Sequence, residues 1–176
     1  MTVEAHDNTA HTDRLQGLWV PAKLWTPDNG DEVMALAGTP PDAYDGRRLA
    51  KAAPRGFAAS VYVPQWVQQN TLFGGAQVRF AKLDDGLGNV HLTLNAKLVN
   101  VGGSLTATGS TVSVDTGVTA GLHTQDLTTV VPLPVFNVGG NFLMRLHLSR
   151  DGGNPGDTYP GDIVFQGAAL LFTADH

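Results

Sequence analysis

The chain lacks cysteine, and only 15% of its residues are charged, against roughly 25% in an ordinary soluble domain. Without cysteine there is no disulfide, thiolate metal site or thiol nucleophile, which is consistent with a reducing cytosol. The formal net charge of −5 argues against general nucleic-acid binding, which needs a basic face. No apolar run approaches the ~20 residues of a membrane-spanning helix. We therefore expect neither nucleic acid nor membrane as a partner.

Residues arranged for catalysis are also missing. The only two glutamates, Glu4 and Glu32, lie near the start of the chain, and the six histidines are scattered without metal-ligand spacing. No nucleophile elbow, phosphate-binding loop or dinucleotide motif occurs. Asp84 and Asp85 precede Gly86, a pattern typical of an aspartate-capped hairpin tip. We expect no enzyme, no catalytic residue, no metal site and no cofactor.

Strand patterns dominate what is present. Residues 89–99 and 141–149 alternate between apolar and polar side chains, whereas the one helix candidate, 46–54, is short and ends at Pro54. The 21 glycines and 10 prolines fall mainly between the β-like runs. The sequence predicts an all-β fold: a single-domain antiparallel β-sandwich (jelly roll) over 17–176, preceded by an extended polar N-terminal arm over 1–16. The arm either packs on a neighbouring subunit or folds back on its own domain.

The segment 102–121 is rich in glycine, serine and threonine. Such a composition is typical of a flexible linker. Leu105, Val112, Val114 and Val118 nevertheless recur at even spacings, which favours short strands or an extended hairpin. We expect strands here.

The connection after residue 149 carries three aspartates among glycines and prolines. A calcium loop would need oxygen ligands at alternate positions and a following glutamate, and neither is present. A compact turn is favoured, in which aspartates accept backbone N–H groups and the arginine pairs with a carboxylate. The expected structural-turn residues are Arg150, Asp151, Asp157 and Asp162.

The run that follows, 162–172, is apolar on both of its alternating faces. One face would line the core, and a strand that is apolar on both sides must be covered on both sides. We expect the second face to be covered by another subunit or by a loop that bends back on it. Gly167 between the halves suggests a bulge or a close backbone approach. The expected interface residues on this strand are Val164, Ala168, Leu170 and Phe172.

These last two strands and their connection resemble those of a family of tailed-phage virion proteins, which share an R-D-G … D-T-x-x-G-D connection before a final apolar strand. The likeness covers about Gly17 to Phe172, and after Trp66 the chain departs from the family pattern. The residues that carry it are Pro21, Ala22, Pro27, Pro64, Trp66, Arg150, Asp151, Gly152, Asp157, Thr158 and Asp162. The resemblance implies a jelly-roll β-sandwich that works as an oligomer on a virion, without catalytic residues.

Members of that family serve as head decoration proteins, fibre parts or minor subunits. One domain without a coiled-coil or collagen repeat favours a capsid decoration (cement) protein. It would be made in the host cytoplasm, form a homotrimer on the capsid surface and clamp neighbouring major capsid protein subunits. The alternative is a tail-fibre or receptor- or glycan-binding module, using exposed Trp19, Trp25 or Trp66. A basic cluster either meets an acidic capsid floor or is an ordinary solvated loop: Arg47, Arg48, Lys51 and Arg55.

Overall fold

Antiparallel strands make up almost all of the regular structure. The computed structural model describes residues 14–28, 34–37, 44–52, 55–62, 72–84, 86–100, 106–115, 121–127, 131–132 and 142–174. The strands are β1 (Arg14–Pro21), β2 (Thr26–Pro27), β3 (Met34–Ala37), β4 (Tyr44–Leu49), β5 (Arg55–Tyr62), β6 (Leu72–Lys82), β7 (Asn89–Asn100), β8 (Thr106–Asp115), β9 (Gly121–Leu127), β10 (Val131–Pro132), β11 (Phe142–Arg150) and β12 (Ile163–Ala174). A single 3-10 turn, η1 (Ala22–Leu24), follows β1, and none of the described segments is a helix long and apolar enough to cross a membrane.

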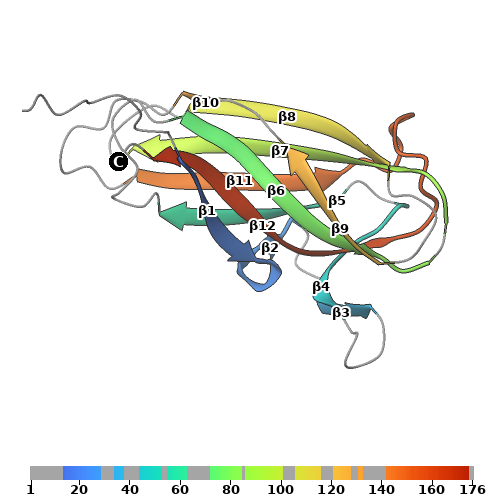
Figure 1. Cartoon of the computed structure of the whole chain (residues 1–176). Helices are drawn as coiled ribbons and strands as arrows, with labels where there is room; N and C mark the ends of the chain where they lie inside the picture. The colour runs from blue at the N-terminus through green and yellow to red at the C-terminus, as the bar shows by residue number, and fades with distance from the viewer. Residues whose placement is uncertain are drawn as a thin grey trace, which may run out of the picture.

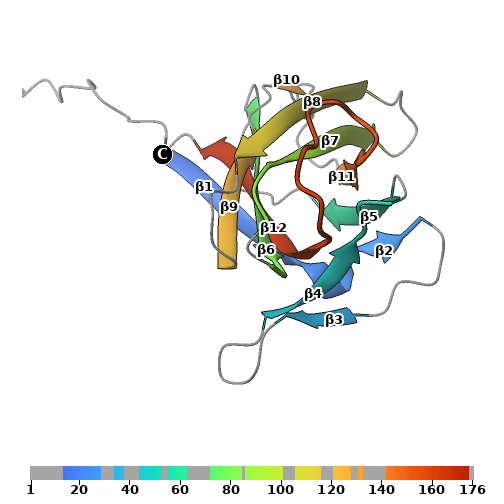
Figure 2. The ribbon, with the colours of Figure 1, turned by 90° about the vertical axis from the view of Figure 1, so that its right-hand side faces the viewer.

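Two sheets pack face to face (Figures 1 and 2). The first follows the order β10–β6–β12–β4–β3, with β1 also paired to β12 and β9 to β6. The second follows β2–β5–β11–β7–β8. All recorded pairings are antiparallel, so the predicted antiparallel β-sandwich is confirmed.

The alternation predicted for the two central strands β7 and β11 is confirmed. On β7, residues 90, 92, 94 and 96 are buried, and on β11 residues 144, 146 and 148 are buried. The glycine-rich segment also forms strands, since β8 and β9 occupy 106–115 and 121–127. Each of these two strands pairs along one edge, β8 with β7 and β9 with β6, and these ladders satisfy backbone groups even where many side chains are small.

Two local predictions are wrong. The helix candidate 46–54 overlaps β4, because Leu49 is buried opposite Ile163 of β12 and the segment pairs with β12 and β3. Asp84 does accept the Gly86 N–H at 2.8 Å, but it caps a connection between the two sheets and not a hairpin, since β6 and β7 belong to different sheets.

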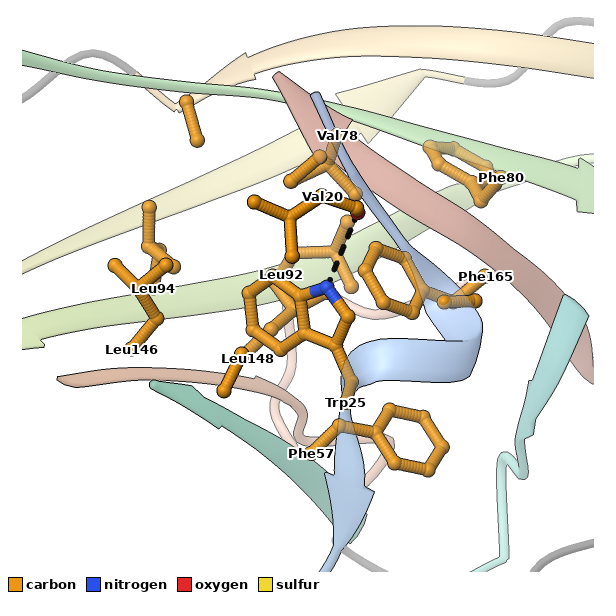
Figure 3. Packing of buried hydrophobic residues seen from close by; sticks show 14 of the residues in the cluster. Val20, Trp25, Phe57, Val78, Phe80, Leu92, Leu94, Leu146, Leu148 and Phe165 are labelled. Carbon is orange, nitrogen blue, oxygen red and sulfur yellow. Dashed lines mark hydrogen bonds between the residues drawn. The ribbon is translucent and has the colours of Figure 1, made fainter. Parts of the chain in front are cut away.

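Trp25 lies at the centre of the core that fills the sandwich (Figure 3). Its side chain is fully buried and its indole N–H donates to the Val20 carbonyl at 3.2 Å. The ring meets Phe165 edge-on with centroids 5.2 Å apart, and Phe165 stacks on Phe57. Residues from both sheets surround it, so this core joins the layers.

The predicted interface on β12 is wrong, because all four of its residues are at most 1% exposed within one chain: Val164, Ala168, Leu170 and Phe172. The last three belong to the central core, as do Ile163 and Phe165. A register shift between Phe165 and Gly167 explains how odd- and even-numbered residues reach the same side. Val164 lies against Gly46 of β4, so its cover comes from the same chain.

Gly167 makes this change of face possible, and the bulge expected there is confirmed. Its φ is +148°, a value that favours glycine, and a Cβ there would lie 2.6 Å from the Val20 carbonyl oxygen and 2.7 Å from Cζ2 of Trp19. The strand therefore needs glycine at this position to change its core-facing side chains from odd-numbered residues before the bulge to even-numbered residues after it.

Gly167→Ala is expected to destabilise the fold by about 3 kcal/mol, through backbone strain and a clash with β1. Urea unfolding followed by tryptophan fluorescence measures the change. Gly17→Ala is the matched control in the same sheet, because a Cβ there meets only ordinary contacts of 3.9 Å. Equal stabilities of the two variants would contradict this account of the bulge.

The predicted boundary between arm and domain is shifted. β1 begins at Arg14, which pairs with Ala174 at the far end of β12. Residues 14–16 thus belong to the sheet, while residues 1–13 of the predicted arm lie outside the described residues. Whether the arm reaches a neighbouring subunit stays a prediction.

Candidate functional site

Arg150, at the end of β11, organises the connection 151–162 between the two sheets. Its buried guanidinium donates from Nε and NH2 to the two carboxylate oxygens of Asp157, at 2.7 and 2.8 Å. The remaining N–H groups reach the carbonyls of Tyr159, Gly161 and Leu49 at 3.0, 2.8 and 3.4 Å. All five donors of the side chain therefore have an acceptor.

Asp157 is equally well satisfied. Besides Arg150, its carboxylate accepts from the Lys51 Nζ at 2.9 Å and from the His91 backbone N–H at 3.1 Å. Burial alone would raise the pKa of Asp157, but the hydrogen bonds from Arg150, Lys51 and His91 outweigh it and hold the pKa below 3.8. The carboxylate is thus ionised and tied at once to β7, to β11 and to Lys51, which follows β4, and these contacts suit a structural role.

The other turn aspartates also bind backbone groups. Asp151 is exposed and accepts the Gly153 N–H at 3.1 Å. Asp162 accepts the Lys51 N–H at 2.8 Å and the Arg48 Nε at 2.7 Å. Burial would raise the pKa of Asp162, but these donors outweigh it and hold the pKa below 3.8. The connection is closed by its own side chains.

The predicted basic interface is largely occupied by these contacts. Arg48 binds Asp162, Lys51 binds Asp157, and the Arg47 Nε donates to the Ala22 carbonyl at 3.2 Å. Arg55 starts β5. Three of the four residues therefore bind groups of their own chain, and only Arg48 keeps a mostly exposed side chain among these three.

The connection 83–88, of which residue 85 is not described, is fastened to the first. The Tyr159 hydroxyl donates to Asp84 at 2.9 Å, and the Asn89 N–H donates to the Thr158 hydroxyl at 2.8 Å. Burial, and then Asp84, raises the pKa of Tyr159 from 10.0 to about 12. Buried Lys82 donates to the Gly86 carbonyl and lies 4.6 Å from the centre of the Tyr159 ring.

These two connections, 83–88 and 151–162, form what we call the clamped end, at the right of Figure 1. It displays two leucines: Leu83 is 44% exposed and Leu87 is 62% exposed. Pro160, which lies close to Gly86 between them in the chain, is exposed as well. The end combines a fastened framework with apolar side chains that nothing in the described chain covers, an arrangement that suits contact with another surface.

The tryptophans separate into core and surface. Trp25 is core, and Trp66 lies outside the described residues. Trp19 is 42% exposed on the outer face of the first sheet, with its ring over Gly167 and the Arg79 guanidinium 5.2 Å from its centre. It is the only one of the predicted aromatic candidates that the structure places at the surface of the described chain.

Histidines and metal ligands form no cluster in the described part of the chain: no group of three or more His, Asp or Glu residues there could hold a metal ion. His91 and His147 are both partly exposed on the outer side of the second sheet, as their strand positions suggested. His147 Nε2 lies 2.8 Å from the Asp28 carboxylate.

Sequence reasoning missed Lys82 and Tyr159, which fasten the two connections. Nothing adjacent to either residue signals the contact between the two connections, because Tyr159 lies more than 70 positions from both Lys82 and Asp84 in the chain. It also missed that Arg145 and Lys97, both exposed, stand directly opposite each other on β11 and β7. Only the strand register reveals that pair.

Comparison with known proteins finds likeness in fold and not in sequence. No protein-family model matches the chain, and no curated protein matches its sequence. The CBM22-1 and GH10 modules of Clostridium thermocellum endo-1,4-β-D-xylanase 10B, solved with xylohexaose, are 12% identical with a TM-score of 0.50. That match covers 89% of this chain but only 27% of the xylanase chain.

Two further solved structures show the range of the matches. The xylan-binding CBM22-2 domain from Paenibacillus barcinonensis is 12% identical, with a TM-score of 0.46, over 86% of this chain and 91% of that domain. Tailspike protein 4 of bacteriophage CBA120 is 8% identical, with a TM-score of 0.40, over 91% of this chain and 19% of the tailspike. Such identities concern the fold alone. The chain is a jelly-roll β-sandwich, as its sequence predicted.

Proposed function

We propose that this protein is a non-enzymatic virion structural protein that decorates a capsid and clamps neighbouring major capsid protein subunits. The observation that carries the proposal is the clamped end, where Leu83 and Leu87 are exposed on a framework closed by buried and partly buried hydrogen bonds. A framework that is already fastened by hydrogen bonds loses little backbone freedom on contact, which favours binding. The residues that resemble the phage virion family, Arg150, Asp157, Thr158 and Asp162, build this same framework.

The expected homotrimer remains part of the proposal. Its contact face is not the one predicted on β12, since that face lies inside the sandwich. The native mass of the free protein, measured by light scattering, checks the trimer.

The exposed leucines provide the sharpest test. The double change Leu83→Asp with Leu87→Asp is expected to weaken binding to undecorated heads at least tenfold, because each 1.4 kcal/mol of lost contact is a factor of ten. Both side chains are exposed, so the fold should be retained. Co-sedimentation of purified protein with isolated heads and, separately, with isolated tails measures the effect.

Leu24→Asp is the matched control, because Leu24 is 61% exposed on η1, outside the two connections of the clamped end. Saturable pelleting of the wild type with heads, lost in the double variant and kept in the control, supports the proposal. Pelleting with tails alone overturns it and favours the second candidate.

The second candidate function is a receptor- or glycan-binding module on a phage tail. Trp19 favours it, because an exposed indole beside a guanidinium can stack on the apolar face of a sugar ring while the cation binds its polar groups. The likeness in fold to carbohydrate-binding modules does not add to this argument, since one fold serves many functions.

A further inference from the structure

The outer face of the second sheet carries two cations in direct opposition. Arg145 on β11 is paired in register with Lys97 on β7, and both residues are exposed. Side chains directly opposite on antiparallel strands have their Cβ atoms about 5 Å apart, and like charges there destabilise the pair. Alternation alone requires only polar residues at these two positions, so the charge conflict has no origin in the fold.

No acid in the described chain relieves the conflict. The other strand neighbour of Arg145 is Ser60 on β5, and that of Lys97 is position 107 on β8, an alanine. The flanking rows contain only neutral residues and His147: Ala58, His147 and Asn95 on one side, Tyr62, Leu143 and Val99 on the other. The nearby carboxylate of Asp28 contacts His147.

This pair differs from four other cations of the described chain. Arg150, Lys51 and Arg48 bind carboxylates in the clamped end, and Arg79 stacks on Trp19. The chain as a whole carries a net charge of −5. Two adjacent cations without a described carboxylate therefore form a local positive site on an acidic protein, and such a site selects a compact acidic partner.

We propose that this cationic row, defined as Ser60, Arg145 and Lys97, binds a carboxylate-rich surface segment of a protein partner. The planar guanidinium matches one carboxylate through two parallel hydrogen bonds, and the ammonium neutralises a second. The Ser60 hydroxyl is a further donor at the end of the row. The inference rests on the proposed capsid role, because a clamp between two subunits needs a second contact surface besides the leucines of the clamped end.

Lys97→Glu separates this role from a purely structural one. It replaces a repulsive pair by an attractive one, so the free protein is expected to melt about 1–3 °C higher. The same change is expected to weaken binding to undecorated heads at least tenfold. Lys97→Arg, which keeps both charges, should bind like the wild type, and Lys23→Glu, at an exposed position of η1, is the control for net charge.

A second arm of the experiment does not depend on heads. Poly-L-glutamate at low salt is expected to raise the melting temperature of the wild type and of Lys23→Glu, but not of Lys97→Glu, and 0.5 M salt should remove the shift. A sulfated polysaccharide is tested in parallel. A shift with the polysaccharide but none with poly-L-glutamate overturns the proposal in favour of an anionic glycan.

The two arms distinguish the possible failures. Head binding that is equal in wild type and Lys97→Glu overturns the cationic row and leaves the capsid role intact. Absence of head binding in the wild type overturns the capsid role. The poly-L-glutamate experiment then tests by itself whether the cationic row binds carboxylates.

Discussion

Asp157→Asn is expected to lower the free energy of unfolding by about 3–5 kcal/mol, although the two side chains have nearly the same size. The buried guanidinium of Arg150 would lose its counter-charge, and an amide N–H would face a guanidinium N–H. Urea unfolding followed by tryptophan fluorescence measures the loss. Asp151→Asn is the control, because exposed Asp151 accepts one N–H that an asparagine oxygen can also accept.

The pH dependence of this difference has a definite sign. The folded-state pKa of Asp157 lies below its ordinary 3.8, so its stabilisation is present above pH 3.8 and is lost as pH falls through the folded pKa. The variant has no carboxylate to protonate there. The difference in free energy of unfolding between the wild type and Asp157→Asn should therefore have its full size at pH 6 and become smaller below pH 3.8. A gap that stays constant over this range would contradict the role of the charge.

Phe172→Asp is expected to abolish folding or to destabilise the protein by more than about 4 kcal/mol. Phe172 is 1% exposed in the core, so the change creates a cavity and also buries a carboxylate without a partner. Circular dichroism and urea unfolding measure the result. The loss approaches the whole stability of an ordinary domain.

Leu171→Asp is the matched control, one residue away on the same strand and facing the other side. Leu171 is half-buried, so its replacement should cost far less than that of Phe172. A folded Phe172→Asp protein with a reduced native mass would restore the subunit interface predicted from the sequence. From the structure we expect Phe172→Asp to lower stability far more than Leu171→Asp does.

The sequence predicted the sandwich because alternation is local information. On β7 and β11, the alternation along a single strand indicates which side chains face the core, and no knowledge of the neighbouring strands is needed. In β12, the same alternation gave the wrong faces for the residues that follow Gly167. Gly167 signalled a bulge, but a bulge reverses the parity of every later position, and so Ala168, Leu170 and Phe172 moved from the expected outer face into the core.

Charges were harder to assign than strands. Arg150 and Asp157 lie seven residues apart, so their pairing could be predicted within the single connection that follows β11. Lys51 is 106 residues from Asp157, and Arg48 is 114 from Asp162, so composition alone showed a basic cluster that was free to bind a partner. Lys97 and Arg145 occupy polar positions of the alternating runs 89–99 and 141–149, but their opposition depends on which strands are neighbours.

The pairing of β1 with β12 has a consequence for engineering. Arg14 and Ala174 face each other at one end of the sandwich, whereas the connection that carries Leu83 and Leu87 lies at the opposite end (Figure 1). A peptide or protein joined to the outer end of either strand would leave the molecule on the side remote from those leucines. On a surface contacted through the clamped end, such a fusion would point outward, so the fold has the geometry of a display scaffold.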